Sequence, residues 1–170
     1  MPVYIALLRA VNVGGTGKLP MAELKAMCAD AGFSKVRTYI ASGNVLFASD
    51  LKIDQAKRRL EKRLHEYAGK PVGVIMRTEG ELAEVLNLNP FPKAPPNRTV
   101  AIFLDAKPRS DALNTITGHR GEELSLGNRE IYVHYADGMA DSKLKIPVAK
   151  LGTARNMNTI AKLVELSSAL

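Results

Sequence analysis

The order strand, helix, hairpin, helix occurs twice along this chain, once on each side of a proline-rich segment. In the first half the predicted strands are 3–11, 36–40, 45–48 and 72–76, and the predicted helices are 20–31 and 54–67. In the second half the predicted strands are 100–104, 122–126 and 130–135, and the predicted helices are 110–116 and 156–166. Runs of strands and helices in this order favour antiparallel sheets packed against helices, which is the α+β class.

Short sequence patterns mark several of the predicted helix ends and turns. Thr78 followed three residues later by Glu81 is typical of a capping box and predicts a short helix to about residue 86. Gly32 and Gly69 stand where helices of the first half should end. Both predicted hairpins contain Gly followed by Asn, at 43–44 and 127–128, which is a common turn sequence.

With its extra strand at 72–76, the first half has the order βαββαβ of a ferredoxin-like unit. Residues 87–97 carry four prolines and no periodicity, which indicates a connection between halves. We therefore predict two pseudo-repeated ferredoxin-like halves related by duplication within one compact unit. They cover residues 1–87 and 99–170, with a Pro-rich linker at 88–98.

The composition of the chain indicates its cellular compartment and the kinds of partner that it favours. The chain has 170 residues and a single cysteine, so no disulfide can form within it, and we expect a cytoplasmic protein. No segment approaches the roughly 20 apolar residues that span a bilayer. The net charge is +7, which favours acidic partners such as nucleotides, nucleic acids or phosphorylated metabolites, although solubility alone can explain it.

The basic residues fall into two groups. Between Ser142 and Val164 there are five bases and no acid. The denser run at 57–63 is interleaved with Asp54, Glu61 and Glu66, which lie four residues from Arg58, Lys57 and Lys62. That spacing predicts an ordinary solvated helix face with internal ion pairs.

The first candidate site is the loop after the first strand. Arg9, Asn12, Gly14, Gly15 and Lys18 lead into the predicted helix that starts near residue 20. A strand end, a glycine loop and a helix N-terminus bring unpaired backbone N–H groups together, and two cations add positive potential. This combination suits a phosphate or a carboxylate. The alternative is that the glycines only turn the chain and that Arg9 pairs with a nearby carboxylate.

Two further segments are candidates for ligand contact. Ser42, Gly43 and Asn44 offer a hydroxyl, a close backbone approach and an amide, although a plain turn explains them as well. At the start of the last helix there are four polar side chains in five residues, more than one helix cap requires. They are Arg155, Asn156, Asn158 and Thr159.

The remaining reactive residues are unpromising. Cys28 lies on the apolar stripe of its helix, which predicts a buried thiol. His65, His119 and His134 are scattered and lack metal-ligand spacing, so we predict no metal site.

Four longer segments carry a family resemblance. They are residues 7–15 (LLRAVNVGG), 19–24 (LPMAEL), 36–45 (VRTYIASGNV) and 155–159 (RNMNT). Together they resemble the bacterial family catalogued as domain of unknown function 1697, over about residues 3–165. The resemblance implies two related ferredoxin-like repeats and no established activity. The family usually has tryptophan where Met157 stands and often threonine where Ala154 stands.

Our functional hypothesis is a binding protein for an anionic, phosphate-bearing small ligand such as a nucleotide. Two alternatives stay open. One is a nucleic-acid-binding protein, whose affinity should fall steeply with salt. The other is an enzyme acting on a phosphorylated substrate, which requires a carboxylate such as Glu23 or Asp141 near the site. The sequence identifies no cofactor and no oligomeric state, and it predicts no membrane partner.

Overall fold

The computed structural model describes residues 1–9, 19–39 and 43–170. These residues form two compact units, one of Met1–Leu82 with Leu163–Leu170 and one of Ala83–Lys162. The division passes through helix α3 (Glu79–Asn87) and helix α4 (Met157–Ser168), each of which contributes to both units. The proline-rich segment 88–98 lies within the second unit, and its role as a linker stays a prediction.

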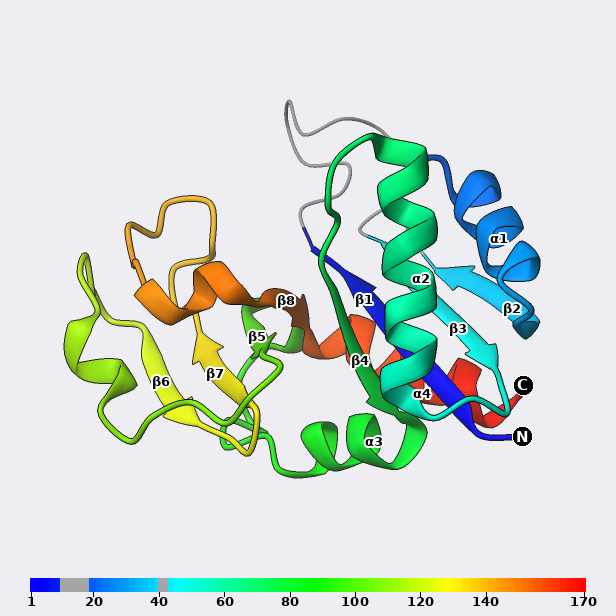
Figure 1. The fold of residues 1–170 in the computed structure, drawn as a ribbon. Helices are drawn as coiled ribbons and strands as arrows, with labels where there is room; N and C mark the ends of the chain where they lie inside the picture. Colours follow the sequence, from blue (N-terminus) through cyan, green and yellow to red (C-terminus); the bar gives the residue numbers. More distant parts are fainter. Residues whose placement is uncertain (10–18, 40–42) are drawn as a thin grey trace. The chain divides into compact units, whose positions relative to one another are not determined.

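The first unit is built on a four-stranded antiparallel sheet (Figure 1). Its strands and helices follow in the order β1 (Val3–Leu8), α1 (Met21–Asp30), β2 (Ser34–Tyr39), β3 (Asn44–Ala48), α2 (Ile53–Ala68) and β4 (Val74–Thr78). The strand order in space is β2-β3-β1-β4, so β1 pairs on one side with β3 and on the other with β4. β1 is therefore a central strand, as its apolar residues on both parities predict.

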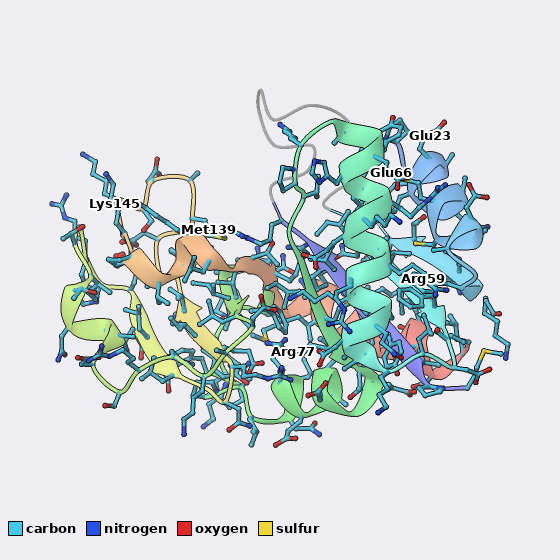
Figure 2. The ribbon with its side chains drawn as sticks, in the orientation of Figure 1. Glu23, Arg59, Glu66, Arg77, Met139 and Lys145 are labelled. Carbon is cyan, nitrogen blue, oxygen red and sulfur yellow. The ribbon has the colours of Figure 1, made fainter. Side chains whose placement is uncertain are left out.

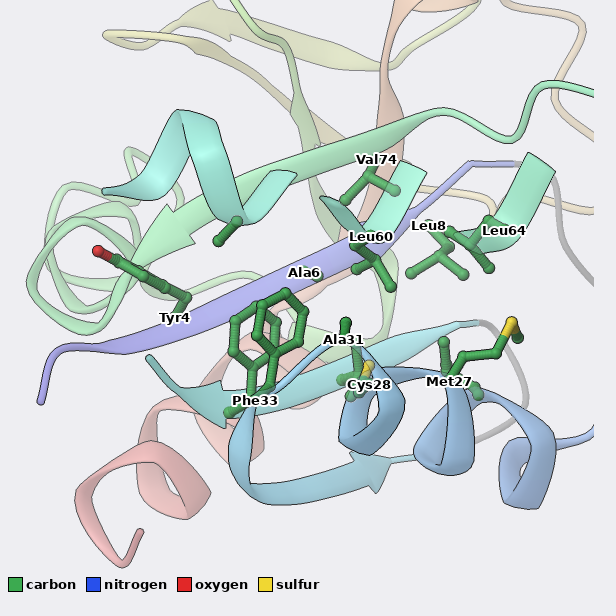
Figure 3. Close-up of a cluster of buried hydrophobic side chains, with 14 of the residues drawn as sticks. Tyr4, Ala6, Leu8, Met27, Cys28, Ala31, Phe33, Leu60, Leu64 and Val74 are labelled. Atoms are coloured by element: carbon green, nitrogen blue, oxygen red, sulfur yellow. The ribbon is translucent and has the colours of Figure 1, made fainter. Parts of the chain in front are cut away.

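Helices α1 and α2 cover one face of this sheet (Figure 3). Tyr4, Ala6 and Leu8 of β1 share one buried core with Leu60 and Leu64 of α2. Phe33 stacks on Phe47 with ring centroids 4.0 Å apart. The alternate residues of β1, Ile5 and Leu7, are also fully buried, so both faces of the strand are covered. Burial of so many apolar side chains is the main stabilising contribution to this unit.

The second unit has its own four-stranded antiparallel sheet. Its elements are η1 (Pro96–Arg98), β5 (Thr99–Phe103), η2 (Ala112–Thr115), β6 (Glu123–Leu126), β7 (Glu130–His134), η3 (Pro147–Leu151) and β8 (Thr153–Asn156), followed by α4. The strand order is β6-β7-β5-β8. Its core contains Val100 and Ile102 of β5, Ile131 and Val133 of β7, and Ile146.

The α+β class is confirmed, with two antiparallel sheets and four α-helices among the described residues. The capping box is also confirmed, since the Thr78 amide donates to Glu81 Oε1 and the Glu81 amide donates to Thr78 Oγ1. Gly69 ends α2 in the left-handed conformation at φ 72°. The helix expected at 110–116 is instead a 3₁₀ turn of four residues, Ala112–Thr115. Within the described ranges, every helix is too short or too polar to cross a bilayer.

Two loops of the second unit are joined at Gly118. Thr117 and Lys145 exchange both backbone hydrogen bonds, at 3.0 and 2.8 Å. Gly118 has φ +69°, and a Cβ placed there would lie 2.0 Å from the carbonyl oxygen of Lys143. Only glycine allows the two backbones to approach this closely.

We expect Gly118→Ala to lower the free energy of unfolding by about 3 kcal/mol or more, since backbone strain and overlap with Lys143 add. Gly121→Ala is the matched control, because Gly121 has φ +84° and a Cβ added there would meet no atom within 4 Å. It should cost only the strain of about 1 kcal/mol. Urea denaturation measures both, and equal losses would contradict the close approach at 118.

Candidate functional site

Arg9 lies directly after β1, at the end of the first sheet. Its amide donates to the carbonyl oxygen of Gly73, just before β4, at 2.9 Å. Its half-buried side chain lies across Gly73, where an added Cβ would come within 2.8 Å of Arg9 Cδ and 3.2 Å of Nη1. The sequence did not single out Gly73, yet the missing side chain there is what makes room for Arg9.

Gly43 and Asn44 lie at the same end of the sheet. The amide of Leu8 donates to the carbonyl oxygen of Gly43 at 2.9 Å, and Asn44 pairs with Leu7. Gly43 has φ 86°, which favours glycine. The side chain of Asn44 is fully buried and donates from Nδ2 to the carbonyl oxygen of Tyr39 at 3.0 Å. Both residues thus support the strand ends next to Arg9, as the turn interpretation requires.

The other candidates of these two segments lie outside the described residues. They are Asn12, Gly14, Gly15, Lys18 and Ser42. The described residues that flank them are Arg9 and Leu19 for the first segment and Tyr39 and Gly43 for the second. Because Leu8 bonds to Gly43 and Arg9 bonds to Gly73, both segments start or finish at this end of the sheet.

Arg155 lies on β8 in the second unit and is only 6% exposed. Its Nη1 donates to Thr153 Oγ1 at 2.6 Å and to the carbonyl oxygen of Ala154 at 2.9 Å. Burial lowers the pKa of the guanidinium to about 10. A shared site of Arg155 with Arg9, which belongs to the first unit, stays a prediction.

The residues after Arg155 begin α4. The side chain of Asn156 accepts a hydrogen bond at Oδ1 from the Thr159 amide at 2.8 Å, which is the geometry of a helix cap. Asn158 is exposed and Thr159 is half-buried. Met157 is 3% exposed, so methionine fills a buried position at the start of α4.

A second buried arginine repeats the arrangement of Arg155 and was missed from the sequence. Arg77 on β4 is 1% exposed, and its Nη1 donates to the carbonyl oxygen of the preceding residue, Met76, at 2.9 Å. The next residue, Thr78, caps α3 as Asn156 caps α4. Arg77 pairs with Ile5 of the central strand of its sheet, and Arg155 pairs with Ala101 of the central strand of the other. Figure 2 labels Arg77 beside α3.

A groove of about 530 Å³ runs between the C-terminal end of α1 and one side of α2. Four of its lining side chains are cations, and Figure 2 labels Arg59 among them, on the side of α2 toward α1. The sequence predicts a paired helix face for this run. Arg63 indeed lies 3.4 Å from Glu66, but its closer partner is Asp30 of α1, at 3.0 Å. The groove arises only when α1 packs beside α2.

A smaller pocket of about 350 Å³ lies in the second unit. Glu122 is buried there and accepts hydrogen bonds from the Arg120 amide at 2.7 Å and from Ser142 Oγ at 3.4 Å. Burial and the charge of Glu122 raise the pKa of Tyr135, which also lines the pocket. Asp141 lines this pocket, whereas Glu23 lies in the first turn of α1. The two carboxylates that an enzyme hypothesis would use therefore belong to different units.

Cys28 is fully buried, as its apolar stripe predicts, and burial raises the pKa of its thiol from 9.0 to about 12. Among the residues that the structure describes, no three His, Cys, Asp or Glu side chains gather closely enough to hold a metal ion.

We expect the native Cys28 thiol to resist disulfide reagents at pH about 8 and to react once the chain is unfolded, because only the thiolate attacks. The raised pKa also means that the native state keeps its proton where the unfolded thiol has lost it. Between pH 9 and about 12 stability should therefore fall with rising pH, by up to about 1.4 kcal/mol per pH unit from this group. Cys28→Ala should remove that part of the pH dependence, and rapid labelling of the native protein would contradict the burial.

Asn156→Ala should lower the free energy of unfolding by about 1 kcal/mol through loss of the α4 cap. Asn158→Ala is the control, because Asn158 is exposed and alanine favours helix. Its effect should stay within about 0.5 kcal/mol. Chemical denaturation compares the two, and equal effects would show that Asn156 does not act as a cap.

Similarity to known proteins identifies the family of the chain. The solved structure of the conserved bacterial protein SP0830 from Streptococcus pneumoniae is similar, with a TM-score of 0.80 and 25% identity over 98% of each chain. A search of curated proteins finds no significant match. The model of the family described as "Protein of unknown function (DUF1697)" matches residues 1–132. The resemblance noted in the sequence is thereby confirmed over residues 1–132, and the chain belongs to this family.

Proposed function

We propose that the chain binds a phosphate-bearing small ligand at the end of the first sheet, where β1 passes into Arg9. The observation that carries the proposal is the seating of the Arg9 side chain against Gly73, at distances that only glycine permits. An arginine side chain that already packs against the backbone has fewer conformations to lose when its guanidinium pairs with an anion. Arginine is also the side chain best suited to phosphate and carboxylate oxygens.

The surroundings support the same site. The segment with Asn12, Gly14, Gly15 and Lys18 starts directly after Arg9, and the segment with Ser42 finishes at Gly43. Glycine-rich backbone between a strand end and a helix start supplies N–H donors for anions. In the proposed site Arg9 and Lys18 neutralise charge, while Asn12 and Ser42 orient the ligand.

The segment from Arg155 to Thr159 contributes less to this proposal than its sequence implies. Arg155 is already buried and bonded to Thr153 and Ala154, and Asn156 is engaged as a cap. Asn158 is exposed, but it belongs to the second unit, and its contact with a ligand at Arg9 stays a prediction.

We also infer that the two units are diverged ferredoxin-like copies, as expected from the order of elements. In space the strands of the two sheets follow the orders β2-β3-β1-β4 and β6-β7-β5-β8. When the strands of each unit are numbered from its first strand, these two orders are identical. The shared arginine and cap at Arg77–Thr78 and Arg155–Asn156 support the inference. In the second copy the two helices are reduced to the short 3₁₀ turns η2 and η3. The helix predicted at 156–166, which the order of elements in the sequence treats as the second helix of this half, corresponds in this alignment to α3 instead.

Thermal unfolding with inorganic phosphate, nucleotides and sugar phosphates tests the binding proposal. A ligand at about 100 times its dissociation constant should stabilise the native state by ~2.7 kcal/mol, which raises the unfolding temperature by roughly 5–10 °C. Arg9→Ala should abolish the shift. Gly73→Ala should weaken it without changing any charge, because the new Cβ displaces the Arg9 side chain.

Arg37→Ala is the matched control, since it removes an exposed arginine from β2 of the same sheet. It should keep the full ligand shift. If no phosphate compound changes the unfolding temperature, or if Arg9→Ala and Arg37→Ala behave alike, the proposed site is wrong.

A further inference from the structure

The groove between α1 and α2 concentrates positive charge away from Arg9. Arg58, Arg59, Lys62 and Arg63 line it, together with the carboxylates of Asp30 and Glu66, so the balance of these six side chains is +2. Arg58 and Lys62 are four residues apart on α2, as are Arg59 and Arg63, which places the cations in two adjacent rows along the helix.

The four cations are engaged to different degrees. Arg63 pairs with Asp30 and Glu66, yet its Nε is buried without a hydrogen-bond partner. Arg59 donates from Nη1 to the carbonyl oxygen of Ala31 at 3.1 Å. Within the described part of the chain, the exposed side chains of Arg58 and Lys62 form no ion pair. Two cations are thus available to an anion, and the Arg63 guanidinium is incompletely satisfied.

The groove lacks the features of a site for a single phosphate. Small phosphate groups are usually held by backbone N–H groups at a helix N-terminus or a glycine loop. On the α1 side the neighbouring backbone is the C-terminal end of that helix, where the amides of Ala31, Gly32 and Phe33 already bond to carbonyls of the helix. The groove also reaches the N-terminal end of α2, at Leu51 and Gln55, but its four cations lie further along that helix, at positions 58 to 63. The available donors are long, exposed side chains, which suit repeated, loosely placed phosphates.

The length of the groove also favours a polymeric ligand over a small one. At 1.5 Å per residue, the lining stretch of α2 from Gln55 to Glu66 is about 16 Å long. That corresponds to about five phosphates along one strand at 3.4 Å each. The described lining residues include no aromatic side chain on which bases could stack. A groove that contacts only the phosphate backbone of a nucleic acid should bind it without preference for its base sequence.

We propose that the groove between α1 and α2 binds the phosphate backbone of a nucleic acid through Arg58 and Lys62, with Arg59 and Arg63 in support. Its residues are separate from the Arg9 site, so either proposal can fail without the other.

Fluorescence anisotropy with a labelled 16-nucleotide strand, alone and as a duplex, tests the proposal on the full chain. Affinity should fall roughly 10- to 100-fold between about 50 and 200 mM salt, as expected for two to four phosphate contacts. The double variant Arg58→Ala/Lys62→Ala should weaken binding roughly tenfold at low salt and reduce the duplex salt slope by about 2. Both side chains are exposed, so the fold should be retained, which circular dichroism checks.

The matched control is Lys25→Ala/Arg37→Ala, which removes the same charge from exposed positions outside the groove. It should leave affinity within about twofold. Arg9→Ala should leave it unchanged as well. Equal weakening by the groove and control variants would overturn the proposal, because net charge alone would then explain binding. Competition by tripolyphosphate at equal phosphate concentration, or binding to phosphatidylserine vesicles but not to oligonucleotides, would also overturn it.

Discussion

The pairing of β1 on both of its edges, with β3 and with β4, is the interaction on which the first unit depends. It satisfies the backbone hydrogen bonds of the strand on both edges and fixes where the strand stops, while packing of side chains buries both faces. Among the described residues, the last backbone hydrogen bonds at that end are those of Leu8 to Gly43 and of Arg9 to Gly73. Arg9 is thereby placed directly after an interior strand, at the end of the sheet where residues 10–18 and 40–42 join the described residues. The small-ligand proposal follows from that placement.

The sequence predicts features that depend on neighbouring residues. The Thr78–Glu81 capping box, the left-handed Gly69 and the buried stripe with Cys28 all follow from local spacing and side-chain chemistry. The helix expected at 110–116 is a 3₁₀ turn, because a short apolar pattern does not distinguish the two and packing decides.

The features that the sequence did not predict depend on tertiary packing. Gly73 matters only because Arg9 lies against it, and its partner is more than 60 residues away. Burial of Arg77 and Arg155 contradicts the usual exposure of arginine, so composition gives no sign of it. The basic groove needs α1 beside α2, and Glu66 pairs with Arg63 rather than with the Lys62 that lies at the favoured spacing. Of the predicted site, Arg9, Gly43 and Asn44 lie together, whereas Arg155 and Asn156 have structural partners of their own.

The direct measurement of the central claim is an amide NMR titration of the protein with inorganic phosphate and with pyrophosphate. If β1 positions the Arg9 guanidinium at an anion-binding site, the amide resonances of Arg9, Gly43 and Gly73 should shift first and saturate together. The resonances of the second unit should not shift. Shifts confined to other regions, with the Arg9 guanidinium and these two glycines unchanged at saturating ligand, would contradict the account.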